Sequence, residues 1–226
     1  DKMTKALIVV TNTPKYDKIN RLTGLWLSEL THFYDVMLKN NIEADFVSPN
    51  GGYVPLDPSS LTNLNEVDNK YYTNASFQNK ALSQTLKPEE INPDDYSIIY
   101  YTGGHGTMWD FPESRAIADI ASYIYTKGGI VSAVCHGVVG LLPVKGQNHR
   151  LLIEGKTLTG FSNAEESANQ TTAEVPFLTE DALIKAGANY QAEAPFTSVV
   201  RVSERLVTGQ NPQSAKAVAE KVITLL

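Results

Sequence analysis

The chain has 226 residues, 42% of them hydrophobic and 19% charged, which is enough to bury the core of one large domain. Its formal net charge of −6 argues against a nucleic acid or an anionic membrane as a partner. The single cysteine excludes an internal disulfide, and the chain shows neither an apolar run of about 18 residues nor a signal-peptide pattern. We therefore expect a cytoplasmic protein.

Strand and helix patterns alternate along the whole chain. Continuous apolar runs, typical of strands buried on both faces, cover residues 5–11, 44–48, 97–101 and the run that ends at Cys135. Helical spacing of apolar residues marks 25–40, 74–86, 113–127, 180–186 and 215–226. Shorter strands are expected at 156–159, 198–202 and 205–208. The polar stretch 53–72 is expected to be irregular and to serve as a functional cover. This alternation predicts an α/β fold with a parallel sheet covered on both faces.

No repeat and no linker rich in Pro, Gly or Ser divides the chain. We therefore expect a single domain over residues 1–226. Asp1-Lys2, which precede Met3, are expected to be a remnant of recombinant expression rather than native sequence.

Cys135 stands where a strand turns into a helix, between an apolar, β-branched run and the small residue Gly137. This pattern is typical of a nucleophile elbow, which pushes one side chain out above a sheet. The alternative is an inert buried cysteine. Because His136 follows the thiol directly, the pattern favours a nucleophile.

A glycine-rich turn, residues 102–106, leaves the strand at 97–101 and includes Gly103, Gly104 and His105. Carboxyl ends of parallel strands meet at one edge of the sheet, so this turn is expected to face Cys135. Its backbone amides could approach a bound oxyanion closely. A glycine-rich turn in which His105 has no function would also explain this stretch.

Glu29 lies on or beside the apolar stripe of its helix, and no Lys or Arg stands four residues later to neutralise it. Such a carboxylate either reaches solvent at the edge of the stripe or points into a site. Burial would raise its pKa and suit it to proton transfer near neutral pH.

The chain has four histidines, and no pair of them has the spacing of a zinc site. His32 is expected to pack locally, and His149 is given no role. With the only cysteine assigned to the elbow, we expect neither a metal nor an organic cofactor.

Together these stretches resemble the ThiJ/PfpI superfamily, whose members share a flavodoxin-like three-layer sandwich with a nucleophile elbow. The motifs that carry the resemblance are residues 23–30, 102–106, 133–137, 158–166 and 206–212. The most similar branch is that of the glutathione-independent glyoxalases (glyoxalase III) and heat-shock chaperones. The metal site reported for one larger branch has no visible counterpart in this sequence.

The resemblance implies an enzyme of the D-lactate dehydratase class that converts methylglyoxal and water to lactate without a cofactor, with a role in stress response. It also implies protein deglycase or holding-chaperone activity in some members, and a homodimer. Carried over by position, Cys135 is the nucleophile, His136 and Glu166 complete a triad, and Glu29 contacts the thiol. Backbone amides near Gly104, His105 and His136 form the oxyanion site. A one-residue shift would exchange Glu166 for Glu165.

The chemistry of these residue types fits a thiolate that adds to a 2-oxoaldehyde, after which Glu29 or His136 moves a proton from C1 toward C2. A small-molecule cysteine amidase or hydratase is one alternative. A glutaminase is disfavoured because no histidine follows His149. A holding chaperone or redox sensor, in which Cys135 is oxidised, is another alternative.

The acidity of the thiol follows from the same pattern. Backbone N–H groups at a helix N-terminus and His136 are expected to lower the pKa of Cys135. A charged Glu29 would raise it, whereas a protonated Glu29 could donate a hydrogen bond to the thiolate. We expect the second arrangement, with Cys135 largely thiolate at neutral pH.

Overall fold

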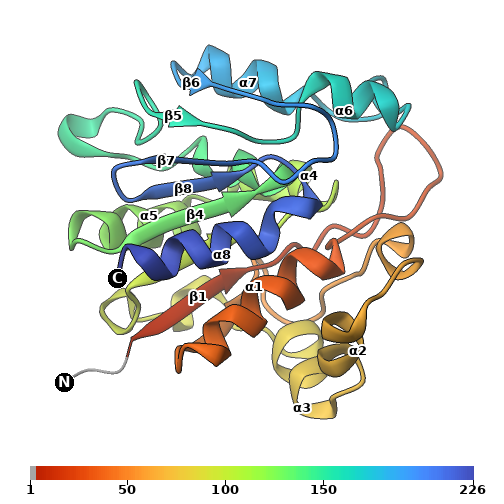
Figure 1. Ribbon diagram of the computed structural model, residues 1–226, viewed down its shortest axis with the longest axis horizontal. Coiled ribbons are helices and arrows are strands. Elements are labelled where there is room, and N and C mark those ends of the chain that lie inside the picture. The colour runs from red at the N-terminus through yellow and green to blue at the C-terminus, as the bar shows by residue number, and fades with distance from the viewer. Residues whose placement is uncertain (1–3) are drawn as a thin grey trace.

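The central element is a six-stranded sheet with the order β2-β1-β3-β4-β8-β7 (Figure 1). The computed structural model describes residues 4–226, so Asp1-Lys2 lie outside the described residues. The strands are β1 Lys5–Val9, β2 Glu43–Val47, β3 Ile98–Tyr101, β4 Ile130–Val134, β7 Val200–Ser203 and β8 Leu206–Gly209. Neighbouring strands are parallel except β7 and β8, which form a hairpin. A second, two-stranded sheet pairs β5 Thr157–Leu158 with β6 Asn189–Tyr190.

Helices cover both faces of the central sheet. Helices α1 Leu27–Lys39 and α8 Ala215–Thr224 pack together on the near face in Figure 1, and α5 Arg115–Thr126 lies behind it. The shorter helices are α2 Glu66–Tyr72, α3 Ala75–Phe77, α4 Thr107–Asp110, α6 Asn163–Ala168 and α7 Thr179–Lys185. This arrangement is the expected α/β three-layer sandwich with a mostly parallel sheet.

Burial on both faces explains why the strands are continuous apolar runs. Along β1, Ala6 and Ile8 pack into the core beneath α1 and α8, while Leu7 and Val9 pack into the core beneath α5. Successive strand side chains point to opposite faces, so a strand between two helical layers has no polar face.

The parallel strands β1, β3 and β4 end at one edge of the sheet, and the loops after Thr11, Thr102 and Val134 meet there. Two glycines allow these loops to approach closely. A Cβ on Gly104, whose φ is 107°, would lie 2.1 Å from the carbonyl oxygen of Gly24. A Cβ on Gly137 would lie 2.1 Å from the carbonyl oxygen of Thr102. Side chains at either position would separate the elements that build this edge.

The structure corrects several expected elements. The stretch 53–72, expected to be irregular, contains a 3-10 turn and α2, which begins with a reciprocal capping box between Asn65 and Asp68. Helices α4 and α6 were not predicted, because four and six residues carry too little periodicity. The segment after the elbow is a 3-10 helix, Cys135–Leu141. Within residues 4–226, none of the helices has the length and apolar character that crossing a membrane requires.

Candidate active site

The expected elbow is present at the end of β4. Val134 is extended, and Cys135 turns into the left-handed region with a φ of 59°. Left-handed backbone costs about 1 kcal/mol or more in a residue other than glycine. The turn directs the thiol away from the sheet while Gly137 lets the following helix pack closely.

A cavity of about 230 Å³ lies at this edge, and Cys135 and His136 line it together with Gly104 and His105. Apolar side chains close its sides, namely Trp26, Phe161, Phe196 and Pro212. The Phe161 ring lies 4.2 Å from the His136 ring, centroid to centroid. Cys135 is only 3% exposed, so a ligand that reaches the thiol must be small.

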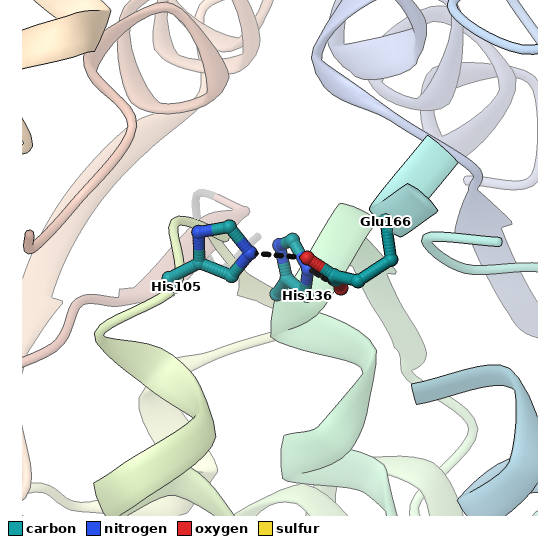
Figure 2. Close-up of side chains that lie close together, drawn as sticks. All are labelled: His105, His136 and Glu166. Carbon is teal, nitrogen blue, oxygen red and sulfur yellow. Dashed lines mark hydrogen bonds and ion pairs between the residues drawn. The ribbon is translucent and has the colours of Figure 1, made fainter. Parts of the chain in front are cut away.

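His136 links the thiol to a carboxylate. Its Nδ1 lies 3.5 Å from Cys135 Sγ, and its Nε2 lies 2.8 Å from Glu166 Oε2 (Figure 2). Burial alone would raise the pKa of Glu166, but the two histidines beside it hold that pKa well below its usual range. A carboxylate accepts, so His136 Nε2 donates and the lone pair on Nδ1 faces the thiol.

The two adjacent glutamates of α6 have different partners. Glu166 contacts His136, as expected, whereas Glu165 accepts from the backbone N–H and hydroxyl of Ser162, at 3.0 and 2.9 Å. Glu165 also accepts from the Phe196 backbone and from the side chains of Gln210 and Asn211. Glu165 therefore anchors the surrounding loops, and Glu166 is the carboxylate at the elbow.

His105 is a second histidine on the same carboxylate. Its Nε2 lies 2.6 Å from Glu166 Oε1, and its Nδ1 lies 2.6 Å from the Tyr16 hydroxyl. Both ring nitrogens are therefore occupied, which leaves the backbone of this residue for the oxyanion role expected of it.

Glu29 points inward from α1 and is completely buried. Neither carboxyl oxygen has a hydrogen-bond partner of good geometry within residues 4–226. Burial raises the pKa of Glu29 to about 8, with the Cys135 thiol and the Gly103 backbone partly offsetting the increase. A Cβ on Gly103 would lie 2.5 Å from Glu29 Oε1, so this glycine makes room for the carboxyl group.

The expected acidity of the thiol is wrong in direction. Burial raises the pKa of Cys135 well above its usual range, the charges of Glu29 and Glu165 add to the increase, and the His136 backbone only partly opposes it. The sequence indicated the N–H groups of the elbow but not the nearly complete burial of the Cys135 side chain. Desolvation of the thiolate is the larger of the two effects on the pKa.

Alkylation by iodoacetamide should report this acidity. We expect a midpoint above the ordinary thiol value of about 8.5. In Glu29→Gln the midpoint should fall by about one pH unit, because the carboxylate that repels the thiolate above pH 8 is gone. Glu43→Gln, an exposed carboxylate on β2, is the matched control and should leave the midpoint unchanged. Equal midpoints in wild type and Glu29→Gln would show that the two groups do not interact.

Within residues 4–226, the side chains that could hold a metal ion are His105, His136 and Glu166, whose donor atoms lie within 4.8 Å of one another. Their nitrogen–oxygen distances of 2.6 and 2.8 Å are hydrogen-bond lengths. Two ligands of one tetrahedral Zn²⁺ are about 3.3 Å apart. The three groups are therefore arranged as a hydrogen-bonded network. These three residues come from separate segments, so spacing along the sequence does not reveal the cluster, and the absence of a metal stays a prediction.

Several residues of the site were not singled out from the sequence. Tyr16 lies in a loop without periodicity, and Thr171, which donates to Glu166 Oε1 at 2.5 Å, follows a short helix. Phe161 lies in the motif at residues 158–166, but the motif indicates no role for this side chain. Aromatic and hydroxyl residues in loops carry no pattern that distinguishes site from surface.

The chain is similar to known proteins over nearly its whole length. A sequence model of the DJ-1/PfpI family matches residues 23–225. Glutathione-independent glyoxalase HSP31 of Saccharomyces cerevisiae is 38% identical in an alignment of 215 positions that covers 90% of each chain. Among solved structures, Rapid Encystment Protein 24 KDa of Francisella tularensis superposes with a TM-score of 0.95, at 38% identity over 99% of both chains. Glyoxalase III of Candida albicans superposes with a TM-score of 0.90, at 31% identity over 100% of this chain and 98% of that one.

Proposed function

The chain belongs to the DJ-1/PfpI family, and on that premise we propose that it is a glutathione-independent glyoxalase, which converts methylglyoxal and related 2-oxoaldehydes with water to 2-hydroxy acids. The observation that carries the proposal is a buried thiol in a small cavity with proton-accepting groups on two sides. His136 lies beside the sulfur, and Glu29, with a pKa of about 8, reaches the same place from α1. One group serves the thiol proton and the other serves a carbon-bound proton.

In the first step the thiol adds to the aldehyde carbon. The S–C bond forms while the thiol proton passes to His136 Nδ1, 3.5 Å away, so the high pKa of the free thiol is no obstacle. The electron pair of the carbonyl bond moves to oxygen. The Gly104 amide, which donates to no acceptor within residues 4–226, is available to stabilise this oxyanion.

The second step moves hydrogen within the substrate. Glu29 takes the proton from C1 of the hemithioacetal, an enediol forms, and Glu29 then returns the proton to C2. Carbon 1 is oxidised from the aldehyde to the thioester level, and C2 is reduced from ketone to alcohol. The electrons balance within one molecule, so this step requires no external oxidant or reductant.

In the third step, water adds to the thioester and the S–C bond breaks. The products are the 2-hydroxy acid and the regenerated thiol, which recovers its proton from His136. Glu166 keeps His136 oriented throughout and stabilises its positive charge.

The test is lactate formation from methylglyoxal by the purified protein without glutathione, followed by NMR in D₂O. We expect lactate, with deuterium at C2 in proportion to exchange of the proton on Glu29 with solvent. Absence of lactate would contradict the proposal, and release of ammonia from amides would instead indicate the amidase.

Glu166→Gln should lower kcat/KM by a factor of roughly 100 to 1,000, because a neutral amide cannot stabilise the imidazolium and can hold the wrong tautomer. Glu220→Gln, an exposed carboxylate on α8, is the matched control and should retain wild-type activity. A loss below about threefold in Glu166→Gln would remove Glu166 from the mechanism.

We also propose a single-domain, cytoplasmic homodimer that does not bind nucleic acid or membranes. One sheet draws its strands from residues 5 to 209, which supports a single domain. The lone cysteine supports a reducing compartment, and the net charge of −6 supports the absence of polyanionic partners. Light scattering after gel filtration would test the dimer.

A further inference from the structure

The carboxylate of Glu166 is shared by two histidines, of which only one reaches the thiol. His136 contacts Oε2 and His105 contacts Oε1 (Figure 2). The other ring nitrogen of His136 lies beside Cys135, and that of His105 lies beside the Tyr16 hydroxyl. The two imidazole rings lie 4.1 Å apart, centroid to centroid. The proposed mechanism uses His136 and gives no role to the side chains of His105 and Tyr16, residues that are 8% and 1% exposed.

The contacts of His105 determine where its proton lies. Burial raises the pKa of Tyr16 to about 12, so its hydroxyl keeps its proton and can donate to Nδ1. A proton on Nδ1 would instead leave the Nε2 lone pair against the Glu166 carboxylate at 2.6 Å, where two acceptors repel. The arrangement that satisfies both contacts is a neutral ring with its proton on Nε2.

We propose that Tyr16 and His105 are positioning residues that reserve the negative charge of Glu166 for His136. Tyr16 holds His105 as the neutral Nε2–H tautomer, which donates to Oε1 and brings no charge. The one positive charge that Glu166 can balance is then free to form on His136, beside the thiol. The inference rests on the proposed role of His136 as the acceptor of the thiol proton.

The alternative charge distribution would impair the site. A protonated His105 would pair with Glu166 and neutralise it, so a proton moving from Cys135 to His136 would meet no balancing charge and would be repelled by a cation one ring away. The groups that face His105 are Tyr16, Glu166 and His136, with Asp57 further off, and Arg21 lies over the outer face of the Tyr16 ring. Burial and the neighbouring His136 lower the pKa of His105, in agreement with a neutral ring.

Tyr16→Phe tests the inference, because it removes the hydroxyl and keeps the ring packed against Trp109. With Nδ1 free to take a proton, we expect the histidine ionisation that forms the acidic limb of the kcat/KM profile to move up by about one pH unit, while the separate ionisation of Glu29 near pH 8 stays in place. Activity should then fall by about tenfold at pH 6 and by less than threefold on the alkaline side. Tyr53→Phe, at an exposed tyrosine, is the matched control and should not move the limb.

A second substitution separates charge control from a structural role. His105→Gln in the Tyr16→Phe background keeps a donor toward Glu166 but cannot be protonated, so the acidic limb should return to its wild-type position. The inference would be overturned if the acidic limb stayed displaced in the double variant. A uniform loss of activity at all pH values in Tyr16→Phe would also overturn it and would indicate that Tyr16 contributes only to packing.

Two readouts do not depend on glyoxalase activity. The chain has only four histidines, so ring ¹⁵N shifts can be assigned with single variants. Wild-type His105 should show an unprotonated Nδ1 and a protonated Nε2, and Tyr16→Phe should raise its titration midpoint. The alkylation of Cys135 should slow at pH 6 in the same variant and recover in the double variant. If no lactate forms but the NMR and alkylation results are as expected, the proposed function is wrong and the positioning role stands. A protonated Nδ1 in wild-type His105 would overturn the positioning role itself.

Discussion

Cys135→Ser is expected to abolish the conversion of methylglyoxal, with a loss of at least about three orders of magnitude in kcat/KM. The substitution replaces sulfur by oxygen at a site that is 3% exposed and changes the volume little. A serine hydroxyl is a far weaker acid than a thiol, and His136 at 3.5 Å from sulfur would lie further from the shorter side chain. The hemithioacetal on which the proposed chemistry depends would then not form.

The control for this variant is its fold. Circular dichroism and the NMR spectrum should match wild type, because serine differs from cysteine by one atom and is no more strained than cysteine at a φ of 59°. Formation of lactate at the wild-type rate by Cys135→Ser would contradict the proposed cysteine mechanism, since the chain has no other cysteine.

Glu29→Gln is expected to lower kcat/KM by about two orders of magnitude, because the amide keeps the shape of the side chain and removes the base. Its pKa of about 8 makes the carboxylate a base matched to neutral pH, and its complete burial keeps competing water away. In wild type, kcat/KM should rise as the pH increases toward 8, since the fraction of ionised Glu29 rises over that range.

The matched comparison for Glu29→Gln is Glu29→Asp, which retains an acid one methylene shorter and should recover part of the activity. The pH dependence near 8 should vanish in Glu29→Gln and persist in Glu29→Asp. A loss of less than tenfold in Glu29→Gln, with the pH dependence intact, would assign the proton transfer to His136 instead.

The sequence predicted the architecture well where periodicity was long. The predicted bounds of β1 and α1 agree with the structure within about two residues. A strand buried on both faces gives a continuous apolar run, and a helix buried on one face gives an apolar stripe, so both patterns are unambiguous. The elbow was predicted from Cys135 and its small neighbours, and the family resemblance drawn from the motifs is confirmed by the match over residues 23–225. Short helices such as α4 and α6 have no such pattern and were missed.

The site was predictable only where a residue type is chemically distinctive. Glu165 and Glu166 are adjacent and identical, and only the helical turn that separates their directions by about 100° decides which of them meets His136. Tyr16 and His105 are 89 positions apart in the sequence, and the residues around neither of them indicate the contact. The pKa of the thiol depends on how completely the sulfur is buried, which no local sequence records.

The buried carboxyl group of Glu29 also has a thermodynamic consequence for the folding equilibrium. Its pKa is about 8 in the fold and close to 4.5 in an unfolded chain, so the folded state binds this proton more tightly. Its contribution to stability is fully present below about pH 4.5 and is lost progressively as the pH rises toward 8, a change on the order of 5 kcal/mol if no other group compensates. Through this group alone, the resistance of the protein to heat should fall as the pH rises from about 4.5 toward 8, where the base is most active. The same ionisation of Glu29 that provides the catalytic base therefore removes the contribution of this side chain to stability.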